Sequence, residues 1–149
     1  MLLKKISSIL VLVNNLISAL FIIMKKLPII ILYVANQSRS TNFYEIILNR
    51  KPILNVPGMT EFLLNESIKL GLMPENGIAK IICPTAKHPS LGNGIPRCEL
   101  YLIVENPEKS LNNAIVAGAK EISKSSLKEW GDIVSYCEDF DGHIIAFAK

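Results

Sequence analysis

The chain has 149 residues, of which 50% are hydrophobic, so we expect one domain with an ample core. Its eight glycines and eight prolines are ordinary numbers and exclude a collagen-like or low-complexity composition. The formal charge of +3 is small, and no basic stripe of the kind that nucleic-acid-binding proteins carry is present. The three cysteines lack paired spacing, which argues against a disulfide framework or a zinc knuckle and favours reduced thiols in the cytoplasm.

Residues 1–26 form an apolar N-terminal extension that contains no acidic residue. No charge occurs from Ile6 to Ile23, and a lysine pair stands on either side of this run. A membrane-spanning helix needs roughly 20 apolar residues, so the run is close to the lower limit of length. Three interpretations stay open: a dispensable or spurious extension ahead of a start at Met24, a membrane anchor, and a signal segment that lacks a clear cleavage motif.

The rest of the chain contains a short internal repeat. The segment from Leu32 to Asn36 resembles the segment from Leu102 to Asn106, and Ser40 and Ser110 keep the same spacing from them. An apolar helical stretch follows each copy. Because a repeat of this kind indicates duplicated structural units, we expect two halves with the same order of elements.

The first half is predicted to begin with a strand at residues 28–34. Asn36 can cap the helix that follows, because its side-chain oxygen accepts an otherwise unpaired backbone N–H. Phe43, Ile46 and Ile47 recur at helical spacing and predict that helix. Three short strands then complete the half, at residues 52–56, 60–64 and 67–73, with a turn at Pro57-Gly58.

The second half repeats that order, beginning with a strand at residues 98–104. Asn106-Pro107 is a strong helix start, since proline's missing N–H costs nothing at the first helical position. Leu111, Ala114 and Ile115 form the predicted buried stripe, and Gly118 ends the helix. The three remaining strands are predicted at residues 121–125, 133–137 and 143–148, the last two joined by a turn at Asp141-Gly142.

These elements predict an α+β domain over residues 27–149, made of two βαβββ modules. Module one covers about residues 27–73 and module two residues 98–149. A connector joins them over residues 74–97, with a helical turn near residues 77–82 followed by a loop rich in proline and glycine. Long loops of this kind are often functional.

The sequence resembles the vicinal oxygen chelate superfamily, which includes glyoxalases, bleomycin resistance proteins and extradiol dioxygenases. Residues 33–36 with Phe43-Tyr44 are similar to its first strand and helix, and residues 99–102 to the start of its second module. The C-terminal motif is the most specific part, with one departure, Phe140, where the family usually has proline. It comprises Trp130-Gly131-Asp132, Tyr136, Asp139, Asp141-Gly142-His143 and Phe147. The resemblance implies paired βαβββ modules forming a cupped mixed sheet open to a small ligand, and a homodimer.

Enzymes of this superfamily hold one divalent metal through His, Glu or Gln side chains on the first and last strands of each module, where it acts as a Lewis acid. On this resemblance the ligand positions fall near Ile29, on residues 68–73, at Glu99 and at Ala146. Only Glu99 is a metal-ligand type. A catalytic metal needs about three protein ligands, so we expect no family-type metal site and no cofactor. A divalent metal remains the alternative.

Strand side chains alternate between faces, so Glu99, Tyr101 and Ile103 share one face, which the resemblance makes the concave one. Together with Tyr33, they predict a mostly apolar pocket floor with one carboxylate and two phenols. Glu99 either contacts a ligand or forms a salt bridge with a neighbour such as Arg97. Alternation places Cys98 on the opposite, buried side of the strand.

Two further residues complete the predicted ligand-binding set of Glu99, Tyr101, Tyr33, Trp130 and His88. His88 lies in the proline-rich loop, where it serves as a lid contact or as a solvated loop residue. Trp130 either walls the pocket or fills the core or a dimer interface. The catalytic residues, if any, are not predicted, because no nucleophile–histidine–acid spacing or phosphate-binding loop occurs.

Three functions follow from these observations. The first is a binding protein of the bleomycin-resistance type, which sequesters an apolar, aromatic or cationic small molecule without a metal. The second is a metal-dependent lyase, isomerase or dioxygenase of the glyoxalase type that recruits His88 with Glu99. The third is a non-catalytic interaction module. The protein is expected in the cytoplasm, with membrane tethering through residues 1–26 as the alternative.

Overall fold

The computed structural model describes residues 2–25, 27–92 and 94–149. Module one contains β1 (Ile29–Val34), α2 (Gln37–Leu48), β2 (Leu54–Val56), β3 (Met59–Leu63) and β4 (Lys69–Pro74). The connector carries α3 (Glu75–Ile82) and a short 3-10 helix (Pro89–Gly92). Module two contains β5 (Glu99–Ile103), α4 (Pro107–Val116), β6 (Lys120–Leu127), β7 (Ile133–Glu138) and β8 (Ile144–Ala148). The predicted α+β class and the two βαβββ modules are confirmed.

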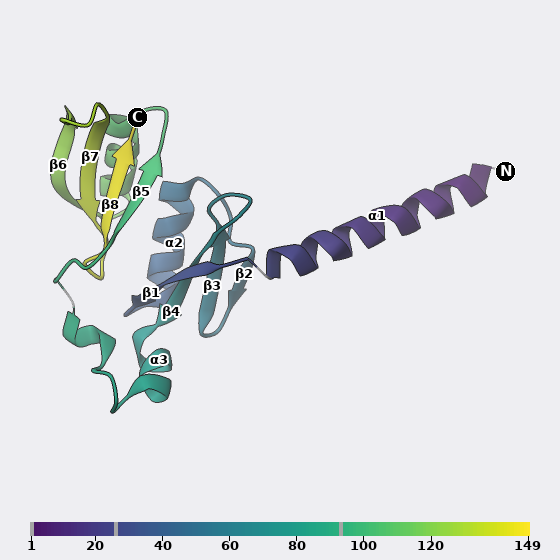
Figure 1. The fold of residues 1–149 in the computed structure, drawn as a ribbon, viewed down its shortest axis with the longest axis horizontal. Helices are drawn as coiled ribbons and strands as arrows, with labels where there is room; N and C mark the ends of the chain where they lie inside the picture. Colours follow the sequence, from purple (N-terminus) through teal and green to yellow (C-terminus); the bar gives the residue numbers. More distant parts are fainter. Residues whose placement is uncertain (1, 26, 93) are drawn as a thin grey trace.

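Each module has its own four-stranded mixed sheet (Figure 1). Sheet A has the strand order β1-β4-β3-β2, and sheet B has the equivalent order β5-β8-β7-β6. In both sheets the first strand runs parallel to the last strand, while the remaining pairs are antiparallel. The sequence repeat therefore corresponds to a repeat of topology.

The repeated asparagines cap the two equivalent helices. The side-chain oxygen of Asn36 accepts a 2.9 Å hydrogen bond from the backbone N–H of Arg39. Asn106 accepts the corresponding 3.0 Å bond from Lys109, one residue before the proline that opens α4. Both predicted helix starts are confirmed, because an asparagine in extended conformation satisfies an N–H that the first turn leaves unpaired.

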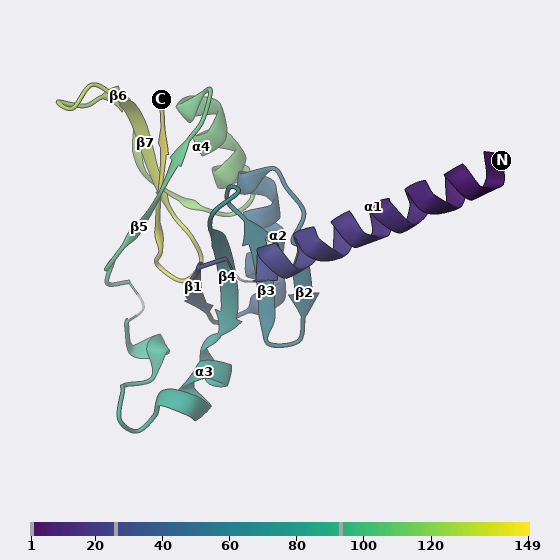
Figure 2. The same cartoon turned by 45° about the vertical axis from the view of Figure 1, so that its right-hand side comes forward.

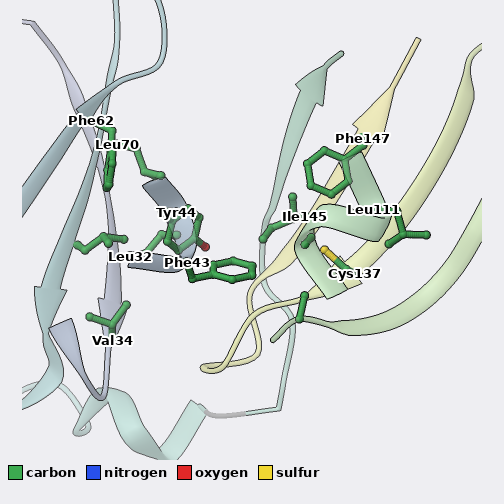
Figure 3. Close-up of a cluster of buried hydrophobic side chains, with 13 residues drawn as sticks. Leu32, Val34, Phe43, Tyr44, Phe62, Leu70, Leu111, Cys137, Ile145 and Phe147 are labelled. Carbon is green, nitrogen blue, oxygen red and sulfur yellow. The ribbon is translucent and has the colours of Figure 1, made fainter. Parts of the chain in front are cut away.

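Helices α2 and α4 lie between the two sheets and contact one another (Figures 1 and 2). The main hydrophobic core spans both modules, and Figure 3 shows side chains of sheet A and α2 facing those of sheet B and α4. Its fully buried aromatic members are Phe43, Tyr44, Phe62 and Phe147. Of the apolar residues whose spacing predicted α2, Phe43 is buried and Ile46 is exposed, and the helix also turns Tyr44 inward.

The core leaves each sheet with an outer face, defined as the face away from its helix. In sheet B the core side chains Leu100, Leu102 and Ile145 alternate with Tyr101 and Ala146, which belong to a second, smaller cluster on the outer face. Since the helices of both modules pack on the inner faces, the two outer faces look in opposite directions. Tyr101, one of the predicted binding residues, lies on the outer face of sheet B.

Helix α1 (Leu2–Lys25) projects away from the domain (Figures 1 and 2). Its side chains from Ile9 to Leu20 are exposed all around the helix. Within the described ranges, no helix combines the length and the apolar character that crossing a bilayer requires. Lys26, one of the lysines that flank this apolar run in the sequence, lies outside the described residues.

Candidate functional site

Two aspartates in the turn between β7 and β8 join module two to module one. Asp139 is buried and accepts a 2.8 Å hydrogen bond from the phenol of Tyr44 on α2. Asp141 accepts one bond of 2.9 Å from the backbone N–H of Ala35 and another of 3.3 Å from the hydroxyl of Ser40. The turn therefore satisfies polar groups at the β1–α2 corner, which lies about a hundred positions earlier in the chain.

The same turn holds a histidine against Asp139. Nδ1 of His143 lies 2.8 Å from the Asp139 carboxylate, and the backbone N–H of His143 donates a second bond of 2.8 Å. Burial alone would lower the pKa of His143, but the hydrogen bond and charge of Asp139, helped by Asp141 and Glu75, raise it above its usual value. Burial alone would raise the pKa of Asp139, but the contacts with His143 and the backbone N–H of Asp141 lower it.

Phe140, which departs from the family's usual proline, packs between the modules. Its ring makes an edge contact with Phe43 at 5.4 Å between centroids, and the Arg39 guanidinium lies 4.4 Å from its centre. On the other side, the ring lies against Gly118, where an added Cβ would come within 2.8 Å of it. An aromatic side chain thus contributes inter-module packing at this position.

The outer face of sheet B presents its side chains in rows across β5, β8 and β7. One row places Tyr101 and Tyr136 on either side of Ala146, which is fully buried beneath its neighbours. The neighbouring row places Glu99 and Glu138 on either side of Ile144. The result is a surface of aromatic rings with carboxylates beside them.

Two residues of the loop between β6 and β7 extend this surface through a hydrogen-bonded chain. The indole Nε1 of Trp130 donates to the phenol oxygen of Tyr101 at 3.2 Å. That phenol donates to the carboxylate of Asp132 at 2.7 Å. The bond to Asp132 is the main reason why the pKa of Tyr101 is raised, since ionisation would remove the donated proton.

Tyr136 already lies close to a positive charge. The ammonium of Lys128 sits 5.4 Å from the centre of its ring, within the range of a cation–π contact. Burial, and after it the negative charge of Glu99, raises the pKa of Tyr136. We call the set of Glu99, Tyr101, Trp130, Asp132 and Tyr136 the aromatic patch.

A separate cavity of about 740 Å³ lies where β1, the connector and module two meet. Tyr33 and His88 line it, together with His143 from the β7–β8 turn. We call it the connector pocket. The first residue of module two, Cys98, also lines it and is exposed, so the predicted buried position of Cys98 is wrong. Alternation fails there because β5 begins one residue later, at Glu99.

His88 ties the connector to α3. Its Nδ1 accepts a 3.2 Å bond from the backbone N–H of Ser90 and also lies 2.8 Å from that residue's hydroxyl. Its Nε2 lies 3.2 Å from the side-chain oxygen of Asn76 on α3, which can only accept, so the proton belongs on Nε2. The ring therefore shapes one wall of the connector pocket.

The five predicted site residues fall into two places. The aromatic patch brings together Glu99, Tyr101 and Trp130, whereas Tyr33 and His88 line the connector pocket. Glu99 and Arg97 form no salt bridge within the described part of the chain. Sequence reasoning missed Asp132 and Tyr136 as patch residues. Both belong to the C-terminal motif, and the period-two spacing of β7 could have identified Tyr136.

Comparison with solved structures identifies the fold. A glyoxalase-related enzyme from Fulvimarina pelagi superposes with a TM-score of 0.69 at 17% identity, covering 83% of this chain and 86% of that one. A glyoxalase/bleomycin resistance protein/dioxygenase family enzyme from Burkholderia phytofirmans gives 0.69 at 12% identity, covering 80% and 94%. This chain has the glyoxalase/bleomycin-resistance fold.

A third structure with this fold, a protein from Agrobacterium tumefaciens solved by NMR, is 27% identical with a TM-score of 0.63, covering 80% of this chain and 93% of that one. No protein-family model and no curated protein matches the sequence. These comparisons therefore show the fold that the resemblance implied.

The residues at the superfamily's metal-ligand positions do not fit a divalent metal. Ile29 and Ala146 offer no donor atom, and the Ile29 side chain lies against Gly71 on β4. Lys69, also on β4, is buried and places its ammonium 2.7 Å from Glu61, so it would repel a cation. Within residues 2–25, 27–92 and 94–149, no group of three or more His, Cys, Asp or Glu side chains gathers as a metal site would require.

Proposed function

We propose that the protein binds a small aromatic or apolar molecule that carries a positive charge. The ligand binds on the aromatic patch, without a metal. The observation that carries the proposal is the hydrogen-bonded chain from Trp130 through Tyr101 to Asp132. This chain fixes an indole and a phenol beside a carboxylate. Rings attract cations through their faces, and carboxylates add a direct charge interaction.

The charge on this face supports a cationic ligand. Glu99 and Asp132 contribute two carboxylates to the patch, and Lys128 shows that an ammonium group can be placed against Tyr136. A ligand cation would take over the place of that flexible lysine. It would lie against the partly exposed rings of Tyr101 and Tyr136, which flank the buried Ala146.

The proposal includes a homodimer in which a second copy covers the patch. On this side of sheet B, Ile103 is 77% exposed and Trp130 is 61% exposed. The strand that carries Ile103 is at an edge of its sheet, with backbone groups available for pairing. Large exposed apolar side chains beside a free strand edge are typical of an interface. The ligand would then be enclosed between two copies and sequestered from water.

The experiment measures binding of phenyltrimethylammonium by the full chain, with tert-butylbenzene as its uncharged counterpart and benzoate as its anionic one. The ammonium compound should bind, and tert-butylbenzene should bind more weakly by about tenfold, which is the contribution expected from a cation–π site. Replacing Trp130 by alanine should weaken binding of the ammonium compound by about tenfold.

The contribution of the Glu99 carboxylate to ligand affinity can be tested with a matched control. Glu99→Gln should weaken binding by about threefold, since Glu99 is solvent-exposed, whereas Glu105→Gln makes the same charge change outside the patch and should leave binding unchanged. Equal affinity for the ammonium compound and tert-butylbenzene, or no binding by either, would refute the proposal. Stoichiometric divalent metal held through Glu99 would favour the metal-dependent alternative.

A further inference from the structure

We infer that the connector pocket is a second binding site, which takes an aliphatic molecule carrying one acidic group such as a carboxylate. The pocket lies apart from the aromatic patch, because none of the five patch residues lines it. Its volume of about 740 Å³ lies within the range of roughly 300–1,000 Å³ that small-molecule sites occupy. The inference is therefore independent of the ligand proposed for the patch.

The walls of the pocket are aliphatic and come from three parts of the chain. Ile31 enters from β1, Ile82 from the end of α3, and Leu91 and Ile95 from the connector. The two connector side chains are largely exposed to solvent, so covering them with an alkyl chain removes apolar surface from water. Tyr33 is the one Phe, Tyr or Trp side chain among the described residues that line the cavity. This lining favours an alkyl chain over a flat aromatic ligand.

Two cationic side chains at the pocket are available to an anion. Lys87 and Arg97 both line it, and neither forms an ion pair with any carboxylate in the described residues. His143 adds a third donor: its Nδ1 bonds Asp139, while no described residue bonds its Nε2. The bond to Asp139 also stabilises the protonated ring, in which Nε2 carries a proton available to an acidic ligand.

Two carboxylates line the same pocket and oppose an anion to different degrees. Asp141 is engaged, because its oxygens accept the backbone N–H of Ala35 and the hydroxyl of Ser40. Glu75, in the first turn of α3, accepts no hydrogen bond from another described residue. Lys87 and Arg97 match these two carboxylates in formal charge, but the oxygens of Asp141 are already occupied, so the two cationic side chains remain available to an acidic ligand.

The test measures octanoate binding to the full chain by NMR titration, with 1-octanol as the uncharged molecule of the same chain length. Octanoate should shift the amide signals of Gly92 and Gly142, which line the pocket, and leave Gly131 in the β6–β7 loop unchanged. Octanol should bind at least about tenfold more weakly, since it lacks charged hydrogen bonds with Lys87 and Arg97.

A pair of double variants separates a specific site from general attraction to a basic protein. Lys87→Gln with Arg97→Gln should weaken octanoate binding about tenfold or more, and should leave phenyltrimethylammonium binding unchanged. Lys109→Gln with Lys124→Gln makes the same change in net charge at exposed positions away from the pocket and should alter octanoate affinity by less than about twofold. Equal binding of octanol and octanoate, or equal losses in the two double variants, would overturn the inference.

Discussion

The phenol of Tyr44 donates a 2.8 Å hydrogen bond to the buried carboxylate of Asp139, although 95 positions separate the two residues in the chain. Burial, followed by the negative charge of Asp139, raises the pKa of Tyr44 well above its usual value, so the phenol keeps its proton. This bond crosses the boundary between the modules inside the shared core. It makes the α2 helix of module one depend on the β7–β8 turn of module two.

Replacing Tyr44 by phenylalanine should lower the free energy of unfolding by about 1–3 kcal/mol, because the ring stays while a hydrogen bond to a buried charged group is lost. Urea denaturation at neutral pH measures this change. Tyr33→Phe is the matched control, since the Tyr33 hydroxyl makes no hydrogen bond to another described residue, and its effect should stay within about 0.5 kcal/mol. Equal effects of the two substitutions would contradict the structural role of the Tyr44 bond.

The Asp139–His143 pair should make stability depend on pH in two directions. The raised pKa of His143 contributes stability that is complete below its unfolded value of about 6.5 and is lost as the pH rises through the folded pKa. The lowered pKa of Asp139 contributes stability that is present above its unfolded value of about 3.9 and is lost as the pH falls through the folded pKa. Stability should therefore be greatest in the mildly acidic range.

Thermal unfolding at pH 6 and at pH 8.5 tests the upper part of this profile. The midpoint should be lower at pH 8.5 in the parent chain, and His143→Gln should reduce that difference because the ring that titrates is gone. His88→Gln is the control, because His88 lies in the connector away from Asp139. If the His143 variant kept the full difference between the two pH values, the ion pair would not be its cause.

Gly118→Ala should be more destabilising than Gly58→Ala, although both glycines have positive φ angles, of 107° and 93°. Both substitutions introduce backbone strain, of the order of 1–3 kcal/mol. At Gly118 the new methyl group would also lie 2.8 Å from the ring of Phe140, whereas Gly58 has open space around it. Chemical denaturation of both variants checks the order. Adding Phe140→Leu to Gly118→Ala should recover part of the loss if the clash is real.

Trp130 is the chain's one tryptophan, so its fluorescence reports on the aromatic patch alone. Tyr101→Phe removes the acceptor for the indole N–H and should increase quenching of Trp130 by acrylamide. Binding of phenyltrimethylammonium should decrease that quenching in the parent chain. Tyr33→Phe, which changes a phenol at the connector pocket, should have no effect. Unchanged quenching in the Tyr101 variant would show that the bond does not hold the indole.

Ile103→Lys should shift the protein from dimer to monomer, because it places a charge at the proposed interface on the outer face of sheet B. Light scattering coupled to size-exclusion chromatography measures the mass. Val116→Lys introduces the same charge at another largely exposed apolar position, at the end of α4, and should leave the mass unchanged. A parent chain that is monomeric at all concentrations would contradict the homodimer.

The helices and strands were predicted well from the sequence, because helix caps, turns and the spacing of apolar residues depend on positions close together in the chain. Asn36 and Asn106 were identifiable as helix caps because capping depends on residues three positions apart. The order of elements along the chain followed from the pattern of the two halves, whereas the order of strands within each sheet was not predicted. The prediction for the connector was less accurate. Helix α3 begins at Glu75, directly after β4, and therefore starts before the predicted helical turn.

The site was predictable only where one strand carries it. Alternation along β5 placed Glu99 and Tyr101 on one face, and a nearby loop brings Trp130 to them. The connector pocket depends on contacts between β1, the connector and the β7–β8 turn, which no local pattern encodes. For the same reason, the inward position of Tyr44 was missed: its partner, Asp139, lies in the other module.

The opposed outer faces of the two sheets have a thermodynamic consequence for ligand capture. A single copy can offer a ligand only one outer face at a time, so a molecule bound there keeps one side in contact with solvent. If a second copy completes the enclosure, binding and self-association become linked equilibria, and each strengthens the other. Apparent affinity for a cationic ligand should then increase as the protein is concentrated, and the ligand in turn should hold the copies together on dilution.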